Sequence, residues 1–360
     1  MKTRPIIVAS VIAAALALSG CQASGDTGSD AQGGGSGAGQ LQLGFSIAQS
    51  GLSFAQEMAD GGQAAADLAG NVELTVSGPT AFDPPQQVKL LEDLARVGAA
   101  DGIAVENLSP ELFVRPLADL AAKDRALVAV DTVPLDGSNV DLYVGNDNLG
   151  AGRALAEAVL EEVPEDATGT VVIGTTIPGV SVLDARGEGI AEAVAELRPN
   201  LTVVGPLETK SEPAQNNDNW TNLVKSNPDA VAFIGTGELD AISLGKIHST
   251  QSGDWFAGGF DPSTDGLASL EAGDLTAIVS PEHYLKGYVA ISLLAAAAGD
   301  ASALPKGWID AGYLLIDSSN VAEVTERQKS DEAKRAWFAD RAAEVVANVE
   351  KYTRPLADAR

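Results

Sequence analysis

The regular alternation of short apolar runs with segments of helical periodicity constrains the fold of this chain more than any other feature. Most segments between the runs are ten to twenty residues long and place apolar residues three and four apart. Strand and helix alternating in this way predict parallel sheets with right-handed crossovers and helices on both faces. The runs are LQLGFSI (41–47), VELTV (72–76), GIAVE (102–106), LVAVD (127–131), DLYVG (141–145), TVVIG (170–174), LTVVG (201–205), AVAFIG (230–235), WFAGGFD (255–261) and LTAIVS (275–280).

So many strand and helix repeats exceed what one open sheet comfortably holds. We therefore expect two doubly wound α/β lobes joined by a hinge, with a ligand site in the cleft between them. The segment VGNDNLGAGRALAEAV (144–159) marks the first passage from one lobe to the other, because a strand ends at Gly145 and a turn leads into the next helix.

The N-terminal segment predicts export. Residues 1–20 combine Lys2 and Arg4 with the apolar run IIVASVIAAALAL and a small-residue exit, which is typical of a secretory signal peptide. The run is too short to span a membrane stably; the alternative is a short N-terminal helix of the fold.

Cys21, the only cysteine of the sequence, resembles the acceptor cysteine of a bacterial lipoprotein, which carries palmitate or similar acyl chains. Two or more acyl chains would anchor the protein to a membrane. Residues 22–40 read as a flexible Gly/Ser tether.

The net charge of −27 excludes one class of partner. Removal of the signal takes away two positive charges and no negative ones, which leaves −29. Such a surface repels nucleic acid and anionic lipid headgroups. We therefore expect no nucleic-acid binding, and membrane attachment only through the lipid on Cys21.

Three apolar runs end on a carboxylate, at Glu106, Asp131 and Asp261. In open α/β sheets ligands bind beyond the carboxyl ends of the strands. Carboxylates gathered there need donors, and a guanidinium such as that of Arg186 supplies the complementary donor. Such a set of groups can bind both the hydrogen and the oxygen of a sugar hydroxyl, so the sequence predicts a small polyhydroxylated ligand.

Four segments together resemble the ribose-binding-protein-like group of type I periplasmic binding proteins, the sugar-binding components of ABC transporters. They are VAVDTVP (128–134), the segment at 144–159 quoted above, DARGEGIAEAV (184–194) and GGFDPSTDGLASLEAGDLTAIV (258–279). The resemblance implies that Asp131 and Asp261 accept from sugar hydroxyls, while Arg186 contacts the sugar from the other lobe. Further ligand-binding candidates are Glu106, Gln49 and Thr236 by position, and Phe54 and Trp220 as stacking rings or core residues.

The resemblance also implies the domain boundaries. The N-terminal lobe comprises 41–145 and about 281–308, and the C-terminal lobe 146–280 and about 309–322, with passages near 144–147, 280–283 and 306–311. Residues 323–360 go beyond the usual family end. They read as one charged amphipathic helix packed on a lobe, with an apolar side made of Trp337, Phe338, Val345, Val346 and Val349.

Simpler roles exist for the three principal candidates. Asp131 suits a turn, Asp261 suits a helix N-cap, and Arg186 could pair on the surface with Asp184 or Glu188. The segment SGPTAFDPPQQ (77–87) is also similar to autoinducer-2 and rhamnose binders of the same superfamily.

Enzyme signatures are missing from the sequence. His248 and His283 lie far apart without partners at metal-ligand spacing, and no phosphate-binding glycine motif occurs in the folded region. Ser243 to Lys246 matches S-x-x-K but without its companion motifs. We expect a binding protein, acting as a monomer without cofactor or metal. It would deliver a sugar to the membrane permease of an ABC importer or, alternatively, signal ligand occupancy to a membrane receptor.

Overall fold

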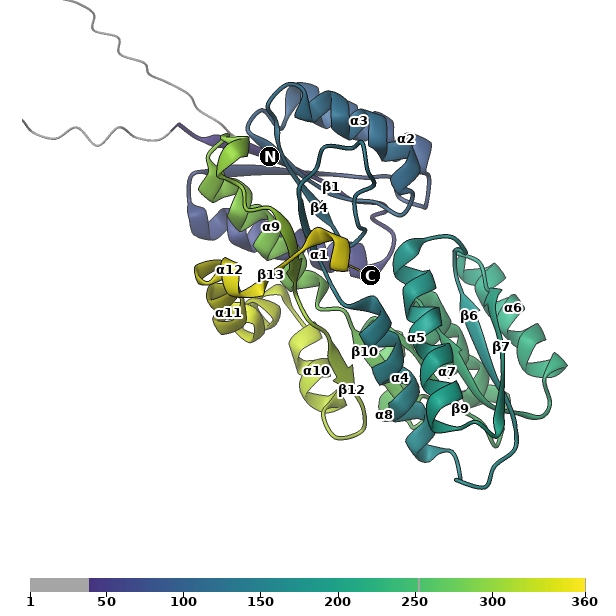
Figure 1. Ribbon diagram of the computed structural model, residues 1–360. Helices are drawn as coiled ribbons and strands as arrows, with labels where there is room; N and C mark the ends of the chain where they lie inside the picture. Colours follow the sequence, from purple (N-terminus) through teal and green to yellow (C-terminus); the bar gives the residue numbers. More distant parts are fainter. Residues whose placement is uncertain (1–38, 252, 360) are drawn as a thin grey trace, which may run out of the picture. The chain divides into compact units, whose positions relative to one another are not determined.

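A computed structural model describes residues 39–251 and 253–359. Gly39–Arg360 forms one compact unit that contains two lobes, each built on its own sheet (Figure 1). The predicted signal peptide, Cys21 and nearly all of the predicted tether lie outside the described residues. Within those residues, no helix is long and apolar enough to cross a membrane.

The N-terminal lobe is a seven-stranded sheet in the order β13-β11-β5-β4-β3-β1-β2. Its central strands β3 and β4 are buried along their whole length, which explains their uninterrupted apolar sequences. Helices α1 and α9 cover one face, and α2 and α3 cover the other. The elements are β1 (Leu41–Ser46), α1 (Ser53–Ala69), β2 (Val72–Ser77), α2 (Pro84–Val97), β3 (Gly102–Glu106), α3 (Pro110–Ala121), β4 (Ala126–Val130), β5 (Leu142–Gly145), α9 (His283–Ala297), η1 (Ala301–Ala303), β11 (Gly307–Asp310) and β13 (Thr353–Arg354).

The C-terminal lobe is a six-stranded sheet in the order β12-β10-β9-β8-β6-β7. Helices α4 and α5 pack on one face, and α6, α7 and α8 pack on the other. The elements are α4 (Asn148–Glu162), β6 (Gly169–Thr175), α5 (Ser181–Leu197), β7 (Leu201–Glu208), α6 (Pro213–Ser226), β8 (Ala230–Gly235), α7 (Glu238–Gln251), β9 (Phe256–Phe260), α8 (Thr264–Glu271), β10 (Ala277–Ser280) and β12 (Leu314–Ile316).

The two-lobed α/β architecture predicted from the sequence is confirmed, and all ten apolar runs form strands β1 to β10. One correction concerns the sheets, which are not purely parallel. Strand β12 pairs antiparallel with β10, and β13 pairs antiparallel with β11. Both are edge strands of three and two residues, too short to produce an alternating pattern in the sequence.

Three passages join the lobes: β5 to α4, β10 to α9, and β11 to β12. Strand β11, which ends at Asp310, belongs to the N-terminal sheet, so the third passage falls at residues 311–313, later than the 306–311 expected. At the first passage Asp147 caps helix α4 by accepting from the Gly150 amide at 2.8 Å. This cap fixes where the first helix of the C-terminal lobe begins.

Asn146 holds the three passages together. It lies fully buried in the first passage, and its Nδ2 donates to the Pro281 carbonyl of the second at 3.0 Å and to the Gly312 carbonyl of the third. Its Oδ1 accepts from the Lys286 ammonium at 2.8 Å. One side chain therefore fixes the relative positions of all three hinge segments.

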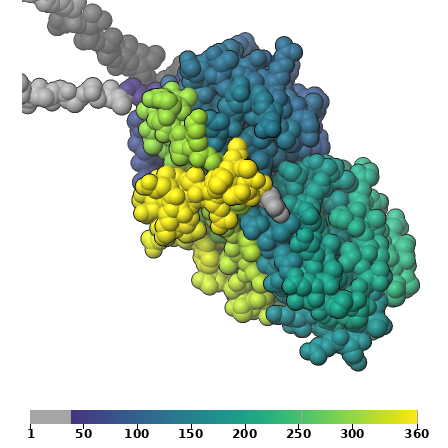
Figure 2. Space-filling view, in the orientation of Figure 1, coloured from purple at the N-terminus to yellow at the C-terminus, as the bar shows by residue number. Residues whose placement is uncertain are grey.

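The C-terminal extension differs from the single helix expected from the sequence. It forms α10 (Val321–Gln328), α11 (Asp331–Ala347), α12 (Val349–Tyr352), β13 and η2 (Leu356–Asp358). Helix α10 packs on α8 of the C-terminal lobe, whereas α11 packs on α9 and α1 of the N-terminal lobe. The extension, yellow-green to yellow in Figures 1 and 2, therefore spans both lobes. Its predicted apolar residues do pack against the core of the N-terminal lobe.

Phe338 tests how much this packing contributes to stability. The side chain is buried, and its ring stacks on Tyr284 with 4.8 Å between centroids. We expect Phe338→Ala to lower the free energy of unfolding by about 3–5 kcal/mol, because it leaves a cavity beside α9. The half-exposed Leu112 provides the control: Leu112→Ala should change stability by less than about 0.5 kcal/mol. Urea unfolding measures both, and equal small effects would show that the extension is only loosely attached.

Candidate functional site

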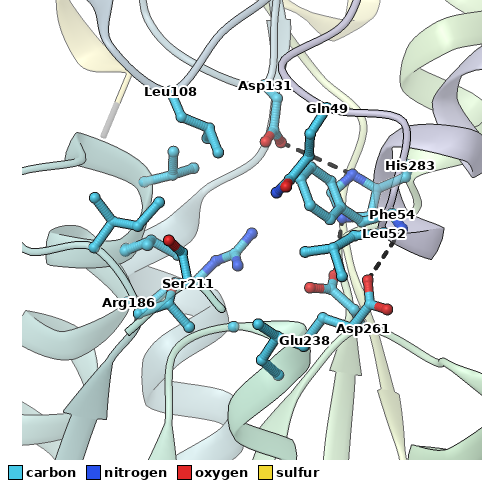
Figure 3. A pocket seen from close by; sticks show the side chains of 16 residues that line it. Gln49, Leu52, Phe54, Leu108, Asp131, Arg186, Ser211, Glu238, Asp261 and His283 are labelled. Atoms are coloured by element: carbon cyan, nitrogen blue, oxygen red, sulfur yellow. Dashed lines mark hydrogen bonds and ion pairs between the residues drawn. The ribbon is translucent and has the colours of Figure 1, made fainter. Parts of the chain in front are cut away.

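A cavity lies between the two lobes, at the carboxyl ends of their strands (Figure 3). The space between its lining atoms is about 520 Å³, with the solvent at its mouth included. Both lobes contribute polar groups, and apolar side chains form most of the remaining walls. The polar side chains are Gln49, Asp131, Thr176, Arg186, Ser211, Glu238, Asp261 and His283, and the apolar ones are Leu52, Phe54, Leu108, Ile177, Val182, Leu183 and Leu239.

Asp131 follows strand β4 directly and faces this cavity, where Figure 3 shows its carboxylate at the top. Its backbone has a positive φ of 66°, and its amide donates to Val144 of the neighbouring strand at 2.9 Å. Its Oδ1 accepts from the fully buried Lys286 ammonium. Burial alone raises the pKa of this carboxyl, but Lys286, helped by His283 and Arg186, outweighs burial and holds the pKa well below its usual range. Asp131 is therefore an ionised acceptor at neutral pH.

Asp261 and His283 form the second polar pair. The His283 Nε2 lies 2.8 Å from Asp261 Oδ1, and its Nδ1 lies 4.0 Å from Asp131 Oδ1. The Phe54 ring lies 5.5 Å from the imidazole, with an interplanar angle of 49°. Asp261 does not cap helix α8, because Ser263 does so by accepting from the Gly266 amide at 3.1 Å. The imidazole thus lies between the strand-end carboxylates of the two lobes and hydrogen bonds with that of Asp261.

Arg186 reaches the cavity from helix α5 and is buried. Its Nε donates to Asn148 Oδ1 at 3.1 Å, and one terminal nitrogen donates to the Thr236 carbonyl at 3.0 Å. The guanidinium also lies 4.3 Å from the centre of the Phe260 ring. These neutral partners fix its plane without neutralising its charge, and they replace the surface pairing with Asp184 or Glu188 considered from the sequence.

Glu238 links the lobes directly across the cavity. It begins helix α7 of the C-terminal lobe, and its carboxylate accepts from the Ser53 hydroxyl at 2.7 Å, the Ser53 amide at 3.3 Å and the Phe54 amide at 3.2 Å. Helix α1 receives no cap from its own N-cap residue, Leu52. A carboxylate from one lobe therefore caps a helix of the other.

Three candidates from the sequence lie outside the cavity lining. Glu106 sits behind Asp131 and accepts from the Ala48 amide; burial and the Asp131 charge raise its pKa to about 8. Thr236 contributes its backbone carbonyl to Arg186. Trp220 lies in the core of the C-terminal lobe, with its indole donating to Asp240 at 2.8 Å, so it does not stack at the cavity. The structure brings the other candidates, Gln49, Phe54, Asp131, Arg186 and Asp261, together at the cavity.

Sequence reasoning missed His283, Lys286 and Glu238. Only His283 had a usable signal, because it lies at the end of the predicted second passage. Arg186 in the lining and Lys286 outside it oppose the carboxylates of Asp131 and Asp261, while burial raises the pKa of Glu238 to about 7, so that this third carboxyl group is only partly ionised at neutral pH. Among residues 39–251 and 253–359, no three His, Cys, Asp or Glu side chains converge as a metal ion would require.

Comparison with known proteins identifies the relatives of this chain. The family model described as "Periplasmic binding protein domain" matches residues 43–301. The D-allose-binding periplasmic protein of Escherichia coli (strain K12) is 25% identical over 257 residues, which cover 69% of this chain and 81% of that protein. The ribose import binding protein RbsB of Bacillus subtilis (strain 168) is 24% identical over 210 residues, 58% of this chain and 66% of that protein.

Solved structures show the same fold. An ABC transporter solute-binding protein from Agrobacterium vitis, solved with alpha-D-tagatopyranose, superposes with a TM-score of 0.71 at 22% identity, covering 79% of this chain and 96% of that one. GanP, a glucose-galactose binding protein from Geobacillus stearothermophilus, superposes with a TM-score of 0.70 at 24% identity, covering 78% and 98%.

We expect closure of the lobes to depend on pH, because Glu238 contacts Ser53 and Phe54 of the other lobe in the closed arrangement that this structure shows. Burial, reinforced by the charge of Asp261, raises the pKa of Glu238 in the closed form to about 7, above the ordinary 4.5 expected when the lobes open. The closed form thus holds this proton more tightly, and closure weakens by up to about tenfold per pH unit between about pH 4.5 and 7. Small-angle scattering from pH 5 to 8 should show the closed fraction falling as pH rises.

Two variants isolate this effect. Glu238→Gln keeps the shape of the side chain without the ionisable proton, so its closed fraction should lose the pH response. Glu188→Gln alters an exposed carboxylate and should keep it. A response that persists in Glu238→Gln would assign the titration to another group.

Proposed function

The chain belongs to the periplasmic binding protein domain family, and from that premise we propose that it is the extracytoplasmic solute-binding component of an ABC importer. Its ligand is a small uncharged sugar or related polyol. The observation that carries this proposal is the opposition, across one cavity, of Asp131 from the N-terminal lobe to Arg186 from the C-terminal lobe. The curated relatives are named for allose and ribose.

The chemistry of the cavity suits hydroxyl groups. Each sugar hydroxyl has one hydrogen to donate and lone pairs to accept, and carboxylates and a guanidinium satisfy the two functions with charge-assisted bonds. The second oxygens of Asp131 and Asp261 supply acceptors, and Arg186 and the Gln49 amide supply donors. Phe54 offers an aromatic face for the C–H side of a sugar ring.

Capture proceeds by closure of the lobes. A ligand held by groups of both lobes stabilises the closed form by its extra contacts there, and so shifts the hinge equilibrium toward it. The closed monomer would then dock on a membrane permease, whose ATPase is a separate chain. Lipid on Cys21 and the tether would keep the protein at the outer face of the cell membrane. The chain itself performs no catalysis in this role.

A ligand sensor is the second candidate. One structural neighbour, with a TM-score of 0.69 at 20% identity, is a XylFII–LytSN complex, in which a chain of this fold is bound to another protein. A receptor could recognise the same closed form. Genes for a permease and an ATPase beside this one would favour import, and a gene for a sensor kinase would favour signalling.

Thermal unfolding tests the proposed ligand class. Pentoses, hexoses, sugar alcohols, inositols, autoinducer-2 and nucleosides are screened, each at about a thousandfold over a micromolar dissociation constant. A true ligand at that excess adds about 4 kcal/mol to the free energy of unfolding and raises the unfolding midpoint by several degrees. We expect one or more sugars or polyols to do so.

Site variants connect the shift with the cavity. Asp131→Asn and Arg186→Met should abolish the shift relative to each variant's own midpoint, whereas Asp184→Ala, an exposed change on the same helix as Arg186, should preserve it. A midpoint raised by a charged ligand or a nucleoside, and by no polyol, would contradict the proposal.

A further inference from the structure

Lys286 is a buried cation that the ligand chemistry does not require. It lies in the first turn of helix α9 with no solvent exposure, and it is absent from the cavity lining. Burial lowers its pKa, and the adjacent Asp131 carboxylate opposes that effect. A buried ammonium is costly unless its donors are used. The hydrogen-bond partners of Lys286 therefore indicate what a cation at this position does.

One partner of Lys286 belongs to the cavity and the other to the hinge. Its Nζ donates to Asp131 Oδ1, on a carboxylate that lines the cavity, and to Asn146 Oδ1 at 2.8 Å. Because an ammonium only donates, it selects the oxygen of the Asn146 amide. The amide NH2 must then point away from Lys286, toward the carbonyls of Pro281 and Gly312 in the other two passages.

Asp131 packs against titratable groups from several elements. The titratable groups that face it are Glu106 from β3, Tyr143 from β5, Arg186 from α5, and His283 and Lys286 from α9. The Tyr143 hydroxyl donates to the Asp131 backbone carbonyl at 2.7 Å. Of these groups, Lys286 donates to the side chain of Asn146, whereas the Tyr143 hydroxyl hydrogen bonds with the Asn146 backbone.

We propose that Lys286 is a positioning residue that couples ligand at Asp131 to the hinge through Asn146. Hydroxyls bound to Asp131 fix the carboxylate. The fixed carboxylate holds the ammonium, and the ammonium holds the Asn146 amide in the orientation that ties the three passages. The role of the ligand in this series of contacts rests on the proposed function. The contacts from Lys286 to the hinge are made within the protein and do not depend on that function.

The hinge part is tested without ligand. Spin labels on Leu112→Cys and Leu197→Cys, exposed positions of the two lobes, report the distance between lobes in a full-length Cys21→Ser background. Lys286→Met removes the charge and keeps the length of the side chain. We expect it to broaden the distance distribution, because the Asn146 amide is no longer oriented. Lys225→Met, which removes an exposed lysine of helix α6 away from the hinge, should leave the distribution narrow.

The ligand part is tested with a sugar found in the thermal screen. Saturating sugar should narrow the distance distribution of the parent protein and fail to do so in Lys286→Met. Affinity is then measured from pH 5 to 7 in the Glu238→Gln background, which removes the titration of that carboxyl. Lys286 is the first of the charges that oppose burial at Asp131, so its loss raises the pKa of Asp131 and the acceptor becomes protonated at a higher pH than in the parent. Affinity should drop about tenfold relative to the parent over this range.

Each outcome decides between the claims. An unchanged distance distribution together with an unchanged pH profile would overturn the coupling, even if Lys286→Met lowers the melting temperature. If no polyol binds the parent protein but Lys286→Met still broadens the distribution, the hinge role stands and the proposed function fails. If Lys286→Met does not fold, Asn146→Ser replaces it. That variant keeps the pair between Lys286 and Asp131, and it should broaden the distribution in the same way.

Discussion

The arrangement of the two lobes depends on the hydrogen bonds of one buried amide, that of Asn146. Three chain segments pass between the sheets, and each leaves a backbone carbonyl or a turn that must be satisfied away from water. Asn146 contacts Pro281, Gly312 and Lys286 simultaneously, so a shift of any one passage disturbs the hydrogen bonds to the others. Lys286 connects this amide to the cavity, because its ammonium also donates to the cavity-lining Asp131.

The two lobes also end a parallel strand at the cleft with the same backbone geometry. Asp131 and Asp261 both follow a parallel strand with a positive φ, 66° and 72°, a conformation that aspartate tolerates better than most residues. The amide of each donates to the next strand, to Val144 and Val279, both at 2.9 Å. The strand is thereby ended without losing its last ladder bond. The carboxylate of each aspartate points into the cleft, which explains why these two buried apolar runs end on an acidic residue.

The sequence was informative where a local pattern carries the structure. Continuous apolar runs identify fully buried strands, and a carboxylate at a strand end identifies the ligand edge of a sheet, so Asp131 and Asp261 could be found. Lys286 and Glu238 could not, because each acts on a residue more than a hundred positions away. Trp220 and Thr236, both candidates from the sequence, lie outside the cavity lining. Whether such a residue lines a cavity depends on the direction of its side chain, which neither composition nor spacing specifies. Edge strands β12 and β13 form because they pair with β10 and β11, and their own residues carry no strand pattern.

The C-terminal extension adds a second connection between the lobes on the hinge side. Arg327, buried at the end of α10, donates to Glu282 at 3.0 Å in the second passage, where φ is +54°. Gln328 donates to Glu57 of the N-terminal lobe and to Pro262 of the C-terminal lobe. Helix α11 then fastens to α1 through Lys334 and Asp60, 2.7 Å apart. Because α10 moves with one lobe and α11 with the other, hinge opening must break the bridge made by Gln328 or bend the chain at residues 329–330. The extension therefore stabilises the arrangement that Asn146 defines, and it does so from outside the cavity.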